Sequence, residues 1–376
     1  MRTGKFINQL NGICRYKAFI PNSLPFEIKM DDALQDLLSK ADMSLGKLDG
    51  IAETVPDVDF FIFMYIRKEA TLSSQIEGTQ ATFSDLLKAE AKIKDHEIHS
   101  DVDEIVNYIS AMNHGLKRLE SFPLSLRLIR EIHQLLLRDV RGAGRMPGEF
   151  RTSQNWIGGP TIQTASFVPP PAHALPELLS NLEKFMHDPS PMPVLIKTGL
   201  IHAQFEGIHP FLDGNGRIGR LLITFYLCQQ GILHKPLLYL SEFFKQHRRN
   251  YYDRLNAFHG KDDVEGWLKY FLTGLSVMAE SAVKKAQKIA KLRQINTDKV
   301  MGLGRSAEKG LLLLNKLYRI PMVTVKNIEK IVGIKNPNAL VLLSKFLDLK
   351  ILKETTGQKR NRVFLYQDYV NLFKES

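Results

Sequence analysis

One short segment, residues 209–220, constrains the fold more than any other part of the chain. It reads HPFLDGNGRIGR, and Gly214 and Gly216 allow its backbone to turn tightly. An apolar run, residues 221–228, follows at once. Backbone N–H groups at the start of a helix attract anions, because the positive end of the helix dipole lies there. The segment therefore predicts an anion-binding turn, with phosphate as the expected guest, at the start of a buried helix.

The side chains of this segment fit the chemistry of a nucleotide. Arg217 and Arg220 are three positions apart, so on a helix they share a face and could both bind phosphate oxygens. Asp213 offers a hard oxygen ligand suited to Mg²⁺, and Asn215 offers a donor for phosphate oxygens. His209 titrates near neutrality and can act as a general base. A base beside a bound nucleotide predicts transfer onto a hydroxyl rather than binding alone.

This segment resembles the signature loop of the Fic family, H-P-F-x-x-G-N-G-R-x-x-R, and no position departs from that pattern. The resemblance implies a protein adenylyltransferase with His209 as its catalytic base. A hydroxyl of a target protein would attack the α-phosphate of ATP, so that pyrophosphate leaves and AMP stays on a Tyr, Thr or Ser side chain. The cofactor would be Mg²⁺ or Mn²⁺, held by Asp213.

The same resemblance implies which residues hold ATP. Residues 214–216 would cradle the α- and β-phosphates, while Arg217 would bind the β-phosphate and Arg220 the γ-phosphate. Gln204 and the pair 251–252 resemble residues that line the nucleotide pocket, although paired tyrosines in a helix are as often part of a core. The full nucleotide-binding set is Glu77, Gln204, His209, Pro210, Phe211, Leu212, Asp213, Gly214, Asn215, Gly216, Arg217, Arg220, Tyr251 and Tyr252.

A second motif, residues 73–78 (SSQIEG), resembles the inhibitory motif of Fic proteins, S/T-x-x-x-E-G/N, with Ser73, Glu77 and Gly78 at the matching places. Glu77 lies in the last turn of its predicted helix, where the dipole disfavours an anion, so it needs a cation. The resemblance implies that Arg220 is this cation and that the γ-phosphate then loses its anchor. In some relatives the same glutamate positions a water that removes AMP, so reversal is also expected. The alternative is a solvated glutamate before a glycine that ends the helix.

Residues 150–171 break the helical pattern that dominates the chain. Two short extended runs flank Gly158 and Gly159, so a β-hairpin is predicted. Ile157 and Gly158 resemble the flap by which Fic proteins align a target segment through strand addition. Residues 147–151 (PGEFR) also look family-like and are expected only to support this flap.

Helical spacing elsewhere predicts a mainly α fold: a Fic-type helical core with a small β-hairpin flap, plus a C-terminal winged helix-turn-helix domain. The predicted helices are residues 32–49, 58–75, 102–119, 125–137, 175–187, 195–204, 267–296, 307–318, 324–332 and 336–349. The predicted domains are residues 1–118 with the inhibitory helix, 119–297 as the catalytic core and 305–376 as the winged helix-turn-helix.

The net charge of +11 is concentrated near the C-terminal end. Residues 301–376 hold 14 Lys and Arg against 6 Asp and Glu. Lys359, Arg360 and Arg362 lie on the predicted wing, between two short strands. These cations could neutralise DNA phosphates, or the domain could dock a protein substrate or a second subunit in a homodimer. The sequence does not decide between DNA and protein as the partner.

Composition adds further expectations. The chain has no apolar stretch that could span a bilayer, no apparent secretory signal, and two cysteines, Cys14 and Cys228, without metal-type spacing, so we expect a cytoplasmic protein. His202, Glu206 and His209 could form a metal face, but they lack the zinc-hydrolase spacing and a fourth ligand. Two more functions are compatible with the sequence: a DNA-binding regulator whose Fic loop senses a nucleotide, and a phosphotransferase that binds ATP in a flipped pose.

Overall fold

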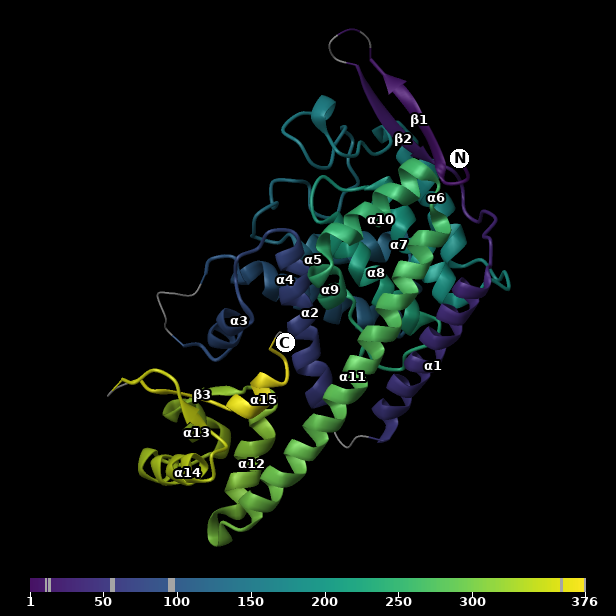
Figure 1. The fold of residues 1–376 in the computed structure, drawn as a ribbon. Coiled ribbons are helices and arrows are strands. Elements are labelled where there is room, and N and C mark those ends of the chain that lie inside the picture. The colour runs from purple at the N-terminus through teal and green to yellow at the C-terminus, as the bar shows by residue number, and fades with distance from the viewer. Residues whose placement is uncertain (11, 13–14, 55–57, 94–98, 359–360, 375–376) are drawn as a thin grey trace.

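The computed structural model describes residues 1–10, 12, 15–54, 58–93, 99–358 and 361–374, and it is mainly helical (Figure 1). A central helical body is joined to a smaller C-terminal unit by one long helix, α11 (Val264–Met301). Helix α1 packs along α11. Within the ranges above, no helix is both long and apolar enough to cross a membrane.

Most helices of the body lie in the predicted ranges, but those at residues 83–90, 241–246 and 248–261 were not predicted. The body helices are α1 (Asp32–Thr54), α2 (Val58–Ile76), α3 (Phe83–Glu90), α4 (Val102–Leu119), α5 (Leu126–Leu136), α6 (Leu175–Met186), α7 (Val194–Ile208), α8 (Asn215–Gln229), α9 (Ser241–Gln246) and α10 (Arg248–Lys261). The predicted stop of the first helix at Gly50 is wrong. Helix α1 continues through this glycine, and Leu48 and Ile51 pack into the hydrophobic core on either side of it.

A β-hairpin that the sequence did not predict lies before these helices. Strand β1 (Gly4–Gln9) pairs antiparallel with β2 (Tyr16–Pro21). The buried Phe19 donates its backbone N–H to the carbonyl of Val168 (2.9 Å). The Arg2 guanidinium donates to both carboxylate oxygens of Glu265, at 2.7 and 2.9 Å. These contacts fasten the hairpin to the segment predicted as a flap and to the first turn of α11.

Helices α7 and α8 form the centre of the body, with α4, α5, α10 and α11 around them (Figure 1). Helix α7 is apolar on nearly all sides, as expected for a helix surrounded by protein, and every residue from Leu195 onward is buried. Most of α8 is buried as well. The loop between them, residues 209–214, is therefore anchored at both ends in the core.

The C-terminal unit combines short helices with one small sheet. Its elements are α12 (Ala307–Leu317), β3 (Met322–Thr324), α13 (Val325–Val332), α14 (Asn336–Asp348), β4 (Lys353–Glu354), β5 (Val363–Leu365) and α15 (Gln367–Asn371). The strands form an antiparallel sheet in the order β3-β5-β4. The order helix, turn, helix and strand pair agrees with the expected layout. The assignment to the winged helix-turn-helix class and the domain boundaries stay predictions.

Two hydrogen bonds fix the C-terminal unit to the body. Tyr369 donates its hydroxyl to the carbonyl of Phe60 in α2 (3.0 Å), and the Asn296 amide of α11 donates to the Tyr366 hydroxyl (2.6 Å). Through these bonds the C-terminal unit is in direct contact with α2, the helix that leads to Glu77.

On the predicted wing, Lys359 and Arg360 lie outside the described residues.

Candidate active site

His209 follows the last residue of α7 in a left-handed backbone conformation, with φ 48° and ψ 61°. A buried guanidinium stabilises this turn. Arg151 donates Nε to the carbonyl of His209 (2.9 Å) and Nη2 to the carbonyls of Ile208 (3.3 Å) and Pro170 (2.6 Å). Burial lowers the pKa of Arg151 to about 10. Arg151 was expected only to support the flap, but it also sets the path of the backbone at His209.

The ring of His209 is held through its Nδ1 atom. The side-chain amides of Asn155 and Asn215 each donate Nδ2 to Nδ1, both at 3.1 Å. Among the described residues, no hydrogen bond involves Nε2. Burial lowers the pKa of His209 to about 3, with help from the Arg151 charge and against that of Glu77. The imidazole is therefore neutral near pH 7.

The loop after His209 is closed by a second histidine that the sequence analysis missed. The His133 ring stacks on Phe211 with ring centres 3.7 Å apart. Its Nδ1 accepts the backbone N–H of Gly148 (2.8 Å), so Nε2 carries the proton and donates to the carbonyl of Asp213 (3.0 Å). Burial lowers the pKa of His133 to about 4. No motif marks this residue, because its partners are distant in sequence.

The N-terminal end of α8 forms the predicted anion site, and a carboxylate of the chain itself lies against it. Gly214 precedes the helix with φ 79°. A Cβ atom at Gly216 would collide with Oε1 of Glu77. Glu77 therefore takes up space beside the first turn of α8, where the helix dipole favours a negative group.

Arg220 binds the inhibitory motif through three hydrogen bonds. Its Nη2 donates to Oε1 of Glu77 (2.7 Å) and to the carbonyl of Ser73 (2.9 Å), and its Nε donates to the Ser73 hydroxyl (2.9 Å). Burial alone would raise the pKa of Glu77, but the charge and hydrogen bond of Arg220 lower it. The structure thus brings together the two residues that the resemblance paired.

The end of α2 presents Glu77 to this arginine. Helix α2 ends at Ile76, one residue before Glu77, and Gly78 then reverses the chain with φ 97°. Arg248 donates Nη2 to the Ile76 carbonyl (3.1 Å), which neutralises the negative end of the helix. The expected position of Glu77 at a helix end is correct.

Arg217 has polar atoms without partners. Its side chain is buried, with Nη1 3.7 Å from Oε2 of Glu104 and Nη2 3.4 Å from Oδ1 of Asp213. Neither Nε nor Nη1 has a hydrogen-bond partner among the described residues. Nη1 still forms an ion pair with Glu104, and both nitrogens keep donors that could bind an added acceptor such as a phosphate.

Asp213 is the residue expected to hold a divalent metal. Its Oδ1 accepts the N–H of Gly214 (2.6 Å), and more than a third of the side chain is exposed. The described residues contain no cluster of three or more His, Cys, Asp or Glu that could hold a metal. A single carboxylate suits Mg²⁺, which keeps waters and binds substrate phosphates. The zinc alternative fails at His202, whose ring nitrogens bind the Gly219 carbonyl and the Tyr251 hydroxyl (2.8 and 2.9 Å).

The three residues expected to line the nucleotide pocket have different surroundings. Tyr251 is a core residue, stacked on Phe244 with ring centres 4.3 Å apart. Tyr252 is half-buried, and Glu77 and Arg220 both influence its hydroxyl. Gln204 donates its amide to the carbonyl of Asn22 (2.9 Å), so it fastens α7 to the chain after β2. The charges of Glu77 and Arg220 act on the Tyr251 hydroxyl as well, so Tyr252 differs from the other two in keeping part of its side chain exposed.

The predicted flap is less regular than a β-hairpin. Only one isolated antiparallel bridge, Ile157 with Phe167, closes it, and a short turn of 3-10 helix (Ile162–Thr164) lies between them. The prediction of a regular hairpin is wrong because the residues between Ile157 and Phe167 form turns and the 3-10 helix instead of paired strands. The segment still lies beside His209, since Asn155 reaches its ring.

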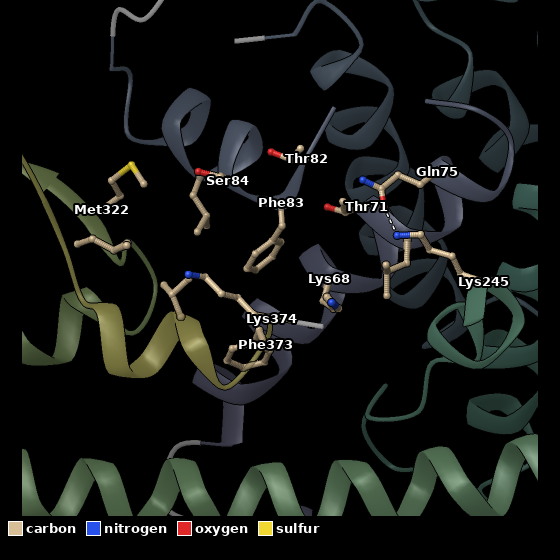
Figure 2. Close-up of a pocket in the computed structure, with 14 residues that line it drawn as sticks. Lys68, Thr71, Gln75, Thr82, Phe83, Ser84, Lys245, Met322, Phe373 and Lys374 are labelled. Carbon is tan, nitrogen blue, oxygen red and sulfur yellow. Dashed lines mark hydrogen bonds between the residues drawn. The ribbon is translucent and has the colours of Figure 1, made fainter. Parts of the chain in front are cut away.

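A separate cavity of about 430 Å³ lies on another face of α2. Lys68, Leu72 and Gln75 line it from α2, and Phe83 and Phe373 close it (Figure 2). His209 is not among its lining residues. Figure 2 shows that the opposite wall comes from the C-terminal unit. The cavity therefore lies between α2 and that unit, and not beside the loop of His209.

Two family models match the chain in the regions that build this site. A model described as Fic/DOC family N-terminal matches residues 35–117, and one described as Fic/DOC family matches residues 123–227. Together they cover half of the 376 residues. The chain belongs to the Fic/DOC family.

Curated relatives of this Fic chain carry the name protein adenylyltransferase. A probable protein adenylyltransferase of Aquifex aeolicus is 36% identical over 89 residues, which is 24% of this chain and 26% of that protein. The protein adenylyltransferase Fic of Aedes aegypti is 32% identical over 181 residues, 47% of this chain and 32% of that protein. The chain thus spans a third or less of the length of these relatives.

Solved Fic structures share the fold. A Fic family protein from Desulfovibrio desulfuricans G20 superposes with a TM-score of 0.59 at 17% identity, covering 90% of this chain and 97% of that one. A Fic domain containing signaling protein from Bacteroides thetaiotaomicron gives 0.52 at 20% identity, covering 69% and 97%. The mainly helical Fic fold is therefore confirmed.

Proposed function

We propose that this Fic protein transfers AMP from ATP to a hydroxyl of a target protein, and that Glu77 restrains the reaction. The observation that carries the proposal is the pair of unsatisfied Arg217 donors at the glycine-framed start of α8, within one helical turn of Asp213. This arrangement suits a polyphosphate. The adenylyltransferase names of the relatives agree with it.

In the proposed reaction a hydroxyl oxygen of the target bonds to the α-phosphorus of ATP. The bond from that phosphorus to the bridging oxygen breaks, and pyrophosphate leaves with the electron pair. His209 receives the hydroxyl proton on its neutral imidazole ring. Arg217 and Arg220 would bind the β- and γ-phosphates, and Asp213 would hold Mg²⁺ or Mn²⁺, which would neutralise phosphate charge.

Glu77 would inhibit by occupying groups that ATP needs. Its carboxylate lies at the N-terminal turn of α8 and holds Nη2 of Arg220 at 2.7 Å. A γ-phosphate cannot bind Arg220 in the same geometry while this ion pair persists. Arg220 is buried, whereas about a third of the Glu77 side chain (31%) is exposed, so loss of Glu77 would leave the buried guanidinium without its charged partner. ATP would then bind in an unproductive pose.

For the C-terminal unit we propose a protein partner rather than DNA. Helix α14 exposes Leu340 and Val341 at 40% and 56%. Apolar side chains at such positions suit a protein surface better than a phosphate backbone. Salt-dependent binding of a random DNA duplex by the full chain would contradict this assignment.

One experiment separates AMP transfer from phosphotransfer and from nucleotide sensing. Glu77→Gly protein is incubated with Mg²⁺ and ATP labelled on the α- or the γ-phosphate, together with a lysate as the source of targets. We expect the α-label, and not the γ-label, on protein, and the double variant Glu77→Gly/His209→Ala should lose it by a factor of about 100 or more. The γ-label on protein would indicate phosphotransfer. Neither label, with ATP still bound, would favour a nucleotide-sensing regulator.

A further inference from the structure

Four charged side chains form a row that leads from the surface to Asp213. At the outer end, Nε of Arg141 lies 3.3 Å from Oε1 of Glu104. Oε2 of Glu104 lies 3.7 Å from Nη1 of Arg217. At the inner end, Nη2 of Arg217 lies 3.4 Å from Oδ1 of Asp213. Positive and negative groups therefore alternate along the row, and the Arg217 guanidinium lies between two carboxylates.

The two carboxylates beside Arg217 differ in burial. The side chains of Arg217 and Glu104 are almost completely buried, whereas more than a third of Asp213 is exposed. Water and salt screen buried charges much less than exposed ones. Arg141 is exposed, so its attraction for Glu104 is weakened by solvent. Glu104 is therefore the principal counter-charge of the buried guanidinium.

Glu104 is held in place by groups other than Arg217. It lies in the first turn of α4, where the helix dipole favours an anion. Its Oε2 accepts the hydroxyl of the buried Thr79 at 2.6 Å. At 3.7 Å the same oxygen compensates the charge of Arg217 without accepting a hydrogen bond from Nη1. Arg217 thus keeps its charge compensated and its donors available.

We propose that Glu104 is a positioning residue that compensates the charge of Arg217 and so leaves Asp213 available to a divalent metal. This proposal rests on the roles of Arg217 and Asp213 in the proposed AMP transfer. Without the charge of Glu104, the buried guanidinium would turn to Asp213 for compensation. Nη2 is already 3.4 Å from Oδ1, so a small movement would close this ion pair. The carboxylate of Asp213 would then offer less negative charge to a metal ion.

The substitution Glu104→Gln removes the charge and keeps an oxygen that can accept the Thr79 hydroxyl. Calorimetry measures the binding of ADP to the full chain, once with excess Mn²⁺ and once with EDTA. ADP is the probe because it ends at the β-phosphate, which is the group assigned to Arg217. The charge of Arg217 also acts on Glu77, so Glu77 stays in every protein that is compared.

We expect the two conditions to respond in opposite ways. With Mn²⁺, Glu104→Gln should bind ADP about tenfold more weakly, which is the typical loss when a group that orients a metal ligand is changed. With EDTA, it should bind ADP at least as tightly as the unaltered chain, because one negative charge near an anion site has been removed. A variant that had only lost structure would bind ADP more weakly under both conditions.

Three further variants identify the route. Asp103→Asn removes the same charge at an exposed position in the same turn of α4, so both affinities should stay within a factor of about two. Asp213→Asn should abolish the gain that Mn²⁺ gives. In an Arg217→Gln background, Glu104→Gln should change the affinity with Mn²⁺ less than about twofold, because the guanidinium that it controls is gone.

Several results would overturn the proposal. An unchanged affinity with Mn²⁺ in Glu104→Gln would show that Arg217 does not need this carboxylate, and a loss under both conditions would show that Glu104 only supports the fold. A tenfold loss that persists in the Arg217→Gln background would mean that Glu104 acts on the metal directly. If Asp213→Asn binds ADP with Mn²⁺ as the unaltered chain does, the metal assignment is wrong and the proposal falls with it. If the affinities respond as expected but Glu77→Gly protein transfers no AMP, the proposed function fails and the role of Glu104 stands.

Discussion

Helix α2 has two working faces, and the contrast between them shows how the molecule is organised. On one face Glu69, Ser73 and the following Glu77 are spaced four residues apart, and all bind groups of the catalytic core. On the other face Leu72 and Gln75 line the cavity against the C-terminal unit. The first face carries a motif that can be read in the sequence, whereas the second has none. Both faces belong to one helix, so whether the cavity influences Glu77 can be tested by substitution.

Removing the carboxylate of the motif should give the largest effect of any change in α2. Glu77→Gly breaks an ion pair with the buried Arg220, and hydrogen bonds to charged groups contribute about 1.5–3 kcal/mol. We expect the initial rate of AMP transfer to rise on the order of a hundredfold. Ser73→Ala, which loses one hydroxyl acceptor of Arg220, should raise it less. Glu120→Gly, at an exposed position, serves as the control. An equal rise in that variant would contradict the assignment of inhibition to Glu77.

On the cavity side, substitution should affect stability more than activity. Leu72 is 2% exposed, and Leu72→Ala enlarges a space that already exists. Truncation of a buried leucine typically costs about 3 kcal/mol. Thermal unfolding should therefore occur several degrees lower, while Leu312→Ala, at a side chain 53% exposed in α12, should change little. An unchanged unfolding temperature in Leu72→Ala would show that packing on this side of α2 does not contribute to stability.

Glu69, on the face of α2 that carries Glu77, should make the stability of the fold depend on pH. Burial raises the pKa of Glu69 to about 7, despite its hydrogen bonds from Ser241 and the charge of Arg220. An unfolded glutamate titrates near 4.3, so between about pH 4.5 and 7 only the folded chain keeps this proton. The free energy of unfolding therefore falls as pH rises through that window, on the order of 3 kcal/mol in total.

Glu69→Gln removes this titration. Urea unfolding at pH 5 and pH 7.5 should show that the variant gains stability relative to the unaltered chain as the pH increases. Other titrating groups are common to both proteins and cancel in the difference. A constant difference between the two proteins would mean that Glu69 is ionised throughout.

Sequence alone was sufficient where the chemistry is local. Residues 209–220 and 73–78 are contiguous motifs, and the pairing of Arg220 with Glu77 came from the family resemblance, which the 2.7 Å contact supports. The helices also followed from periodicity, because each is a local pattern. What failed was any feature that depends on distant partners. The N-terminal hairpin and the continuation of α1 past Gly50 both depend on packing against α11 or its neighbours.

The missed site residues share the same cause. Asn155 and His133, together with Arg151, which was expected only to support the flap, act on His209 and its loop from 54 to 80 positions away in sequence. No motif in the neighbouring sequence marks these residues as contacts of His209 or its loop. Only the fold brings the end of α5 and the start of the flap segment next to the loop, so no spacing rule could assign them to the base.

A smaller effect should reveal whether the two faces of α2 are coupled. Gln75 accepts from Nζ of Lys245 (2.8 Å) and donates to the carbonyl of Ala81 (2.9 Å), and both bonds brace the turn that carries Glu77. Gln75→Leu keeps the volume but loses both, each worth about 1 kcal/mol at most in such a position. A turn that is less well braced should release Arg220 more often, and AMP transfer should rise roughly threefold.

A double-mutant cycle separates this coupling from a direct effect on catalysis. If Gln75 acts only through Glu77, then Gln75→Leu should change nothing once Glu77→Gly is present. A threefold rise in both backgrounds would place its effect in the catalytic core, through α9 and Lys245. No rise in either would show that the last turn of α2 holds Glu77 without help from the cavity side, and that the C-terminal unit cannot influence inhibition by this route.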